Sequence, residues 1–229
     1  MSKNELMAFP LKKGAYEKPE RVNPNIPSKK YDNIDSACEQ TQIGNDGNVY
    51  IPEDQMHKLL NKNKNSSRYV LDNNIPDSDR VTINNMKMVN SSSVVGYLDK
   101  NSHQTRNAEE ADLNRYGRES LTRIGDSDQA EAQRRKIDTH VSKELPKLRY
   151  QRDVNYDEIT GEPLEKGAAF HHKNNKAIYN NPLDVIDPSQ GIVVNPDTHK
   201  EIHRRDIMDG NELDRNIEDI KNTVKKKRT

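Results

Sequence analysis

The chain has few of the residues that usually build a large core. Hydrophobic residues make up only 31% of its 229 residues, tryptophan is absent and phenylalanine occurs twice. Globular domains usually contain about 45–50% apolar residues, so we do not expect the whole chain to pack around one core. Part of it is expected to be disordered, or to become ordered only against a partner.

Cysteine is also nearly absent, because Cys38 is the only one. A single cysteine excludes an intramolecular disulfide and a zinc finger built on several cysteines. Folding must therefore depend on packing or on a metal ion held by histidines.

No excess of charge is present, since 37 Lys and Arg residues balance 37 Asp and Glu residues. Any electropositive surface for nucleic acid must be local. The chain also lacks an apolar run near the ~20 residues that span a bilayer, and Met1 to Pro10 is too short and polar for a signal peptide. We expect a protein made in the cytoplasm without a membrane span, exported, if at all, by a route that reads no cleavable signal.

The N-terminal part is rich in Asn, Ser, Lys, Asp and Pro, and its apolar residues occur in twos and threes. This composition predicts a largely irregular polar region over residues 1–106, used for delivery or partner binding. Two short apolar islands, Gln55 to Leu60 and Ser93 to Leu98, predict weak local elements within it.

Residues 107–149 are rich in Ala, Glu, Arg and Gln and are expected to form a charged helical region. Apolar residues recur there with four-residue spacing at Ile137, Val141 and Leu145. Gly125 is expected to interrupt the helix, Asp126 to cap the second part and Pro146 to end it.

The clearest signals for strands, helices and a functional site lie in residues 150–229, the predicted C-terminal domain. Two short β-type runs, Ala168 to His171 and Ile192 to Val194, can pair as strands. Asn195 followed by Pro196 indicates a helix start, with the Asn side chain as the N-cap. A closing helix is expected to pack over this unit through an apolar face formed by Leu213, Ile217, Ile220 and Val224.

Four of the seven histidines lie in this domain, as two pairs. The predicted helix places His199 and His203 on one face, which lets both imidazoles reach one metal ion. His171 or His172 can supply a third ligand, but adjacent strand residues point to opposite sides, so only one of them shares the metal easily. Three imidazoles and an open position are typical of a catalytic metal site.

The order of these motifs resembles the HNH endonuclease family, including the DNase domains of colicin-type bacterial toxins. The resemblance covers about 50 residues, and its motifs are His171-His172, Gln190-Gly-Ile-Val-Val194 and His199-Lys-Glu-Ile-His203. It implies a ββα-metal domain in the C-terminal third and says nothing about the first 150 residues. Together with the charged helices and the irregular N-terminal region expected from composition, this predicts an α+β protein.

The resemblance also implies roles for the histidines. His172 would be the general base, and one divalent ion (Zn, Mg, Mn or Ni) would be held by His171, His199 and His203. No small-molecule cofactor is expected. The other histidines, His57, His103 and His140, are interpreted as ordinary surface or helix residues.

Two departures from the family pattern affect the prediction. Gln190 occupies the place of the usual central Asn and would orient the base through the same amide group. The cysteines of a zinc knuckle are absent near Tyr156 and Ile159, and we expect apolar packing of Tyr156, Ile159, Leu164 and Phe170 to hold that corner. Arg204 and Arg205 are candidate phosphate-binding residues, although basic residues late in a helix are equally explained by its dipole.

The resulting hypothesis is a metal-dependent endonuclease that hydrolyses phosphodiester bonds in DNA. The preferred setting is an antibacterial toxin or effector, with an immunity protein or delivery machinery as partner. A phage or mobile-element nuclease is the first alternative. The second is a non-catalytic, zinc-stabilised module that binds DNA or protein.

Overall fold

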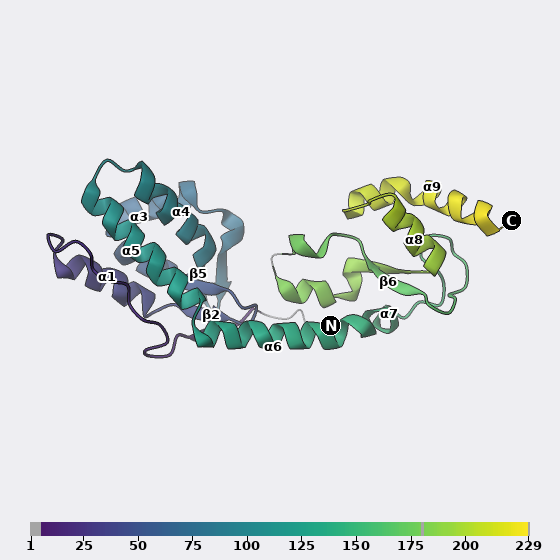
Figure 1. Ribbon diagram of the computed structural model, residues 1–229, viewed down its shortest axis with the longest axis horizontal. Helices are drawn as coiled ribbons and strands as arrows, with labels where there is room; N and C mark the ends of the chain where they lie inside the picture. Colours follow the sequence, from purple (N-terminus) through teal and green to yellow (C-terminus); the bar gives the residue numbers. More distant parts are fainter. Residues whose placement is uncertain (1–5, 180, 229) are drawn as a thin grey trace. The chain divides into compact units, whose positions relative to one another are not determined.

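The computed structural model describes residues 6–179 and 181–228, which form a mixed α and β structure (Figure 1). The chain divides into two compact units, unit 1 (Met1–Lys136) and unit 2 (Ile137–Thr229), with the division inside helix α6 (Asp128–Glu144). Each unit has its own cluster of buried apolar side chains. None of the helices within the described residues is long and apolar enough to span a membrane.

Unit 1 contains a five-stranded antiparallel sheet with the strand order β1-β2-β3-β5-β4. Its strands are β1 (Ala8–Pro10), β2 (Gln42–Gly44), β3 (Val49–Pro52), β4 (Arg80–Ile83) and β5 (Met86–Asn90). Its helices are α1 (Ser28–Cys38), α2 (Met56–Leu59), α3 (Lys64–Asn74), α4 (Ser91–Gln104) and α5 (Ala108–Gly125). The core under these elements includes Ile34, Ile51, Met56, Val89, Leu98 and Leu121.

The prediction of an irregular region over residues 1–106 is therefore wrong. Several asparagines of this region lie at the starts of helices or in a turn between two strands. Asn84 and Asn85 have φ angles of 51° and 63°, and this left-handed pair makes the two-residue turn between β4 and β5. The side chains of Asn63, Asn90 and Asn107 accept hydrogen bonds from the first backbone N–H groups of α3, α4 and α5. Strands of three to five residues are too short to show a periodic pattern.

The expected helical region is confirmed, with the break at Gly125 between α5 and α6. The predicted cap is wrong: Asp126 ends α5, while the hydroxyl of Ser127 accepts from the N–H of Ala130 at 3.4 Å. Pro146 lies just past the end of α6, as expected, in a single 3₁₀ turn.

Unit 2 is built on an antiparallel hairpin of β6 (Ala169–His172) and β7 (Gly191–Val194). A short helix, α7 (Leu148–Gln151), precedes it, and α8 (Pro196–Arg204) and α9 (Gly210–Arg228) follow. Both expected strands are thus present, and α8 begins at the predicted Pro196.

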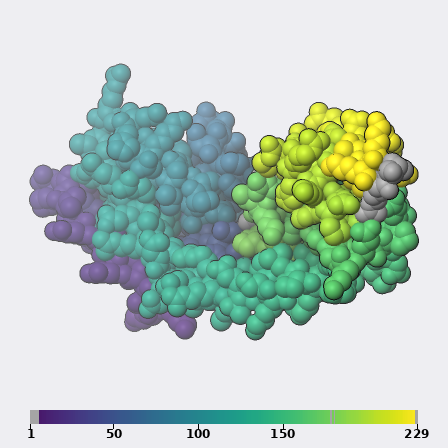
Figure 2. Space-filling model, turned by 45° about the vertical axis from the view of Figure 1, so that its right-hand side comes forward, coloured from purple at the N-terminus to yellow at the C-terminus, as the bar shows by residue number. Residues whose placement is uncertain are grey.

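Helix α9 packs beside α8 and closes the core of unit 2 (Figures 1 and 2). Its Leu213, Ile220 and Val224 are buried in one cluster with Ile159, Ile192, Val194 and Ile202, and Ile217 packs against that cluster. The predicted closing helix is confirmed.

Candidate metal centre

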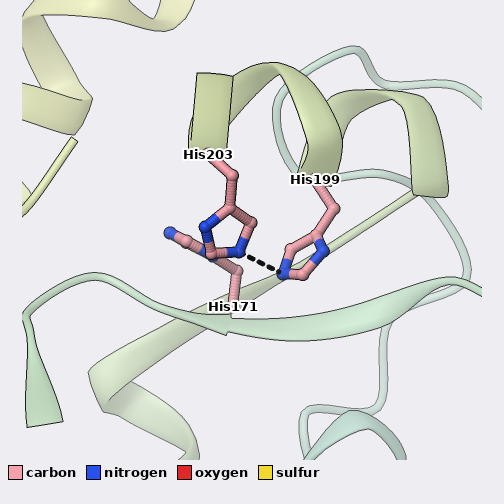
Figure 3. A group of neighbouring side chains, drawn as sticks. All are labelled: His171, His199 and His203. Atoms are coloured by element: carbon pink, nitrogen blue, oxygen red, sulfur yellow. Dashed lines mark hydrogen bonds between the residues drawn. The ribbon is translucent and has the colours of Figure 1, made fainter. Parts of the chain in front are cut away.

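Three imidazoles converge between β6 and α8. His199 and His203 are four residues apart, so both extend from the same face of α8 towards His171 on β6 (Figure 3). Each ring offers one nitrogen, and these three nitrogens all lie within 4.8 Å of one another. The three histidines are therefore close enough to bind a single metal ion.

The spacing of these nitrogens fits the geometry of a metal site. The Nε2 atoms of His199 and His203 are 3.2 Å apart. Two imidazole nitrogens at about 2.0–2.1 Å from a tetrahedral ion lie about 3.3 Å from each other. The rings of His171, His199 and His203 meet edge to face, with centroids 4.5 to 5.4 Å apart, so none blocks another from the shared centre.

Burial keeps two of these imidazoles, His171 and His199, in the state that binds metal. Burial, and then the neighbouring His199 and His203, lower the pKa of His171 to about 4. The pKa of His199 is lowered by burial and then by His203. Both rings are therefore neutral near pH 7, and a neutral ring offers the lone pair that a metal requires.

His172 is oriented differently and is not part of this cluster. Its Nε2 lies 2.7 Å from the carbonyl oxygen of Val185, which can only accept a hydrogen bond, so Nε2 carries the hydrogen and Nδ1 is the acceptor of the neutral ring. Burial lowers the pKa of His172, the bond to Val185 raises it, and the positive charge of Lys176 lowers it. His172 is thus a largely neutral imidazole with a fixed tautomer.

The contact that orients His172 comes from Val185 in the 3₁₀ segment Pro182–Ile186, whereas Gln190 was predicted to orient it. Gln190 joins the hairpin through its backbone, since its carbonyl accepts from the N–H of Lys173 at 2.9 Å. A role for the Gln190 side chain in catalysis stays a prediction. A backbone acceptor 13 residues from His172 leaves no signal in the sequence.

Arg204 and Arg205 are both paired with Glu201, whose side chain is 0% exposed. The distances to Glu201 Oε1 are 2.6 Å from Arg204 Nη2 and 2.9 Å from Arg205 Nε, and Lys227 Nζ of α9 lies 3.1 Å from Oε2. Phosphate binding by the two arginines stays a prediction, but their observed role is to neutralise a buried carboxylate.

The corner near Tyr156 is held by polar contacts, contrary to the expected apolar packing. Tyr156 is 52% exposed, although Ile159 is buried as predicted. The carboxylate of Asp157, which is fully buried, accepts from the N–H groups of Ile159 and Thr160 at 2.9 Å and from that of Asn195 at 2.7 Å. Asp157 thereby connects this turn to the residue that precedes α8.

Asn195 does not cap α8 with its side chain, so that expectation is wrong. Its amide instead accepts from the N–H of Glu165 at 2.8 Å and donates to the carbonyl of Pro163 at 3.1 Å. The sequence signal for Asp157 was the Asx-turn potential of an Asp before Glu-Ile-Thr-Gly. Its pairing with Asn195 depends on tertiary structure.

The histidines face a pocket of about 420 Å³ that a substrate can enter. Its walls come from the end of β6, the segment after β6 and the segment after α8, and they include His171, His172, Asn174, Lys176, His199, His203 and Asp206. Among the described residues, the only cluster of potential ligands found is the three-histidine group. One side of that group is thus open to the pocket.

Comparison of the chain with models of known families, with curated proteins and with solved structures found no match.

Proposed function

We propose that unit 2 is a metal-dependent nuclease of the HNH (ββα-metal) type that hydrolyses phosphodiester bonds in DNA. The observation that carries the proposal is the geometry around one pocket. Three imidazoles, from His171, His199 and His203, converge on one point, and a fourth imidazole, from His172, lines the same pocket with a lone pair available.

Each histidine has a definite task in the proposed reaction. His171, His199 and His203 would hold a divalent cation, which would stabilise negative charge on the phosphate and on the departing 3′ oxygen. Nδ1 of His172 accepts a proton from a water molecule while the oxygen of that water attacks phosphorus. The bond from phosphorus to the 3′ oxygen breaks in the same step. Val185 keeps Nε2 of His172 protonated, so Nδ1 is the nitrogen that acts as the base.

The open side of the cluster argues for catalysis over a purely structural zinc site. A structural zinc ion usually has four protein ligands, whereas catalytic sites keep one position for water or substrate. Three histidines are the ligands found within the described parts of the chain. A zinc-stabilised binding module is therefore the less favoured alternative.

The antibacterial setting stays a prediction from the resemblance. Its other support, an extended N-terminal arm for delivery, is lost because unit 1 is folded. The nuclease proposal does not depend on that arm, since all four histidines belong to unit 2.

The test is cleavage of plasmid DNA by the full chain, with and without EDTA, together with two matched variants. His172→Ala should reduce cleavage by at least about 100-fold, the usual contribution of a general base, while metal content stays at the wild-type level. His140→Ala, an exposed histidine of α6, should cut normally. Full activity of the His172→Ala protein, or cleavage that EDTA leaves unchanged, would refute the mechanism.

A further inference from the structure

The proposed site needs a positively charged side chain beside the metal to hold the nucleic-acid backbone. The two arginines predicted for this role are already paired with a carboxylate. Both guanidinium groups, of Arg204 and Arg205, are paired with buried Glu201. Neither arginine lines the pocket in front of the histidines. The basic residue that does line it is Lys176.

The backbone around Lys176 is fixed on both sides. The N–H of Asn175 donates to the carbonyl of Met208 at 3.0 Å, and the side chain of Asn175 accepts from the N–H of Ala177 at 3.0 Å. Asn174 accepts from the N–H of Gly210 at 2.9 Å. These bonds tie the segment after β6 to the segment after α8, so the lysine is held on a braced wall of the pocket.

Lys176 lines the same pocket as His172 and the three-histidine group, and its ammonium group is not neutralised. Asp206 lines the same pocket. No ion pair joins Asp206 or any other carboxylate to Lys176 within residues 6–179 and 181–228. An exposed lysine near neutral imidazoles presents an uncompensated charge to whatever enters the pocket.

We propose that Lys176 binds a backbone phosphate of the nucleic acid that enters this pocket, next to the phosphodiester bond facing the three histidines. This inference rests on the proposed function and names the residue that recognises the substrate. A phosphate is the expected ligand because a flexible ammonium with three donors matches a single anionic oxygen group. The contact is independent of base sequence, as phosphate contacts are.

Binding of a short fluorescent DNA duplex to the full chain, measured by anisotropy in EDTA, separates this contact from cleavage. Lys176→Gln, which keeps a polar side chain and removes the charge, should weaken binding about threefold to tenfold. It should also lower the slope of log K against log salt by about 0.9, the value for one lost phosphate contact. Lys176→Arg should retain most of the affinity.

The matched control is Lys200→Gln, since Lys200 is exposed on α8 but does not line the pocket. Equal effects of Lys176→Gln and Lys200→Gln, or no effect of Lys176→Gln, would overturn the proposal. So would loss of bound metal after Lys176→Gln, because the lysine would then act on the site's structure.

Cleavage by the metal-loaded protein distinguishes this proposal from the nuclease proposal. If wild type cuts DNA, Lys176→Gln should reduce kcat/KM with unchanged metal content. If wild type binds the duplex through Lys176 but never cuts it, the nuclease proposal fails and the phosphate contact stands. If wild type cuts and Lys176→Gln changes neither binding nor kcat/KM, the nuclease proposal stands and the phosphate contact fails.

Discussion

The position of His172 depends on a glycine directly across the hairpin. Gly191 pairs with His172, and a Cβ atom added there would overlap the ring of Phe170 and lie 2.5 Å from the carbonyl oxygen of His171. Phe170 in turn meets the His172 ring edge to face, with centroids 4.9 Å apart. Only a residue without a side chain lets this ring arrangement form.

Gly191→Ala should therefore destabilise unit 2 by about 1–3 kcal/mol, the usual cost of overpacking, and should weaken metal binding. Urea unfolding and metal titration measure the two effects. Gly210→Ala is the control, because an added Cβ there meets Asn174 at an ordinary 3.5 Å and should change stability by less than about 0.5 kcal/mol. Equal stability of the Gly191→Ala and wild-type proteins would show that Phe170 can move without cost.

At the scale of elements, the two faces of α8 serve different purposes. One face carries His199 and His203 towards β6, while Glu201 lies on the opposite face in a fully buried position towards α9. Hydrogen bonds from Arg204 hold the pKa of Glu201 well below its ordinary value, and Arg205 and Lys227 add to this effect although burial opposes it. The Glu201 carboxylate thus joins α9 to the helix that carries the metal ligands.

Glu201→Gln should destabilise unit 2 by about 1–3 kcal/mol near neutral pH, since it removes the buried carboxylate that Arg204, Arg205 and Lys227 share. The pKa of Glu201 is lower in the folded than in the unfolded state, so this stabilisation is fully present above the unfolded pKa of about 4.3 and is lost progressively as pH falls from there through the folded pKa. Urea unfolding at pH 7 and pH 3.5 should show the difference from wild type shrinking at the lower pH. The control is Glu218→Gln, which alters a 4.0 Å pair between the exposed Glu218 and Lys221 and should have little effect at either pH. The ion-pair explanation would be refuted if Glu201→Gln and wild type differed in stability as much at pH 3.5 as at pH 7.

The elements of unit 2 were predictable because their signals are local. Short β-type runs predicted β6 and β7, Pro196 predicted the start of α8, and four-residue spacing predicted the face shared by His199 and His203. The elements of unit 1 were missed because asparagine, read as a mark of irregular structure, caps helices and forms a left-handed turn there. Composition alone does not distinguish these uses of asparagine.

The polar contacts that position the site could not be predicted from the sequence. Asp157 meets Asn195 across 38 positions of the chain, and His172 meets Val185 through a backbone carbonyl. A motif gives the type and spacing of residues, but it does not give the partners that the tertiary fold brings to them. For that reason Arg204 and Arg205 were predicted as phosphate ligands, while their pairing with Glu201 was not foreseen.

At the scale of the whole molecule, each unit has a separate core, and the candidate site lies in one of them. Buried residues of unit 1 such as Ile34, Ile51 and Leu98 belong to one cluster, and those of unit 2 such as Ile192 and Val224 to another. Metal binding to the three histidines can therefore stabilise unit 2 directly, while no ligand of this group comes from residues 6–136 of unit 1.

The full chain should accordingly unfold in two thermal transitions, of which only one depends on metal. A metal present at 100 times its dissociation constant adds about 2.7 kcal/mol to the unit that binds it, which for a unit of this size raises its Tm by several degrees or more. Scanning calorimetry of the full chain with metal, and again with EDTA, measures both transitions. The His203→Ala protein, which lacks one of the three ligands, should give the EDTA profile even with metal. A wild-type profile that is identical with and without EDTA would mean that these histidines hold no ion that affects folding. A shift of both transitions together would mean that the two units do not unfold independently.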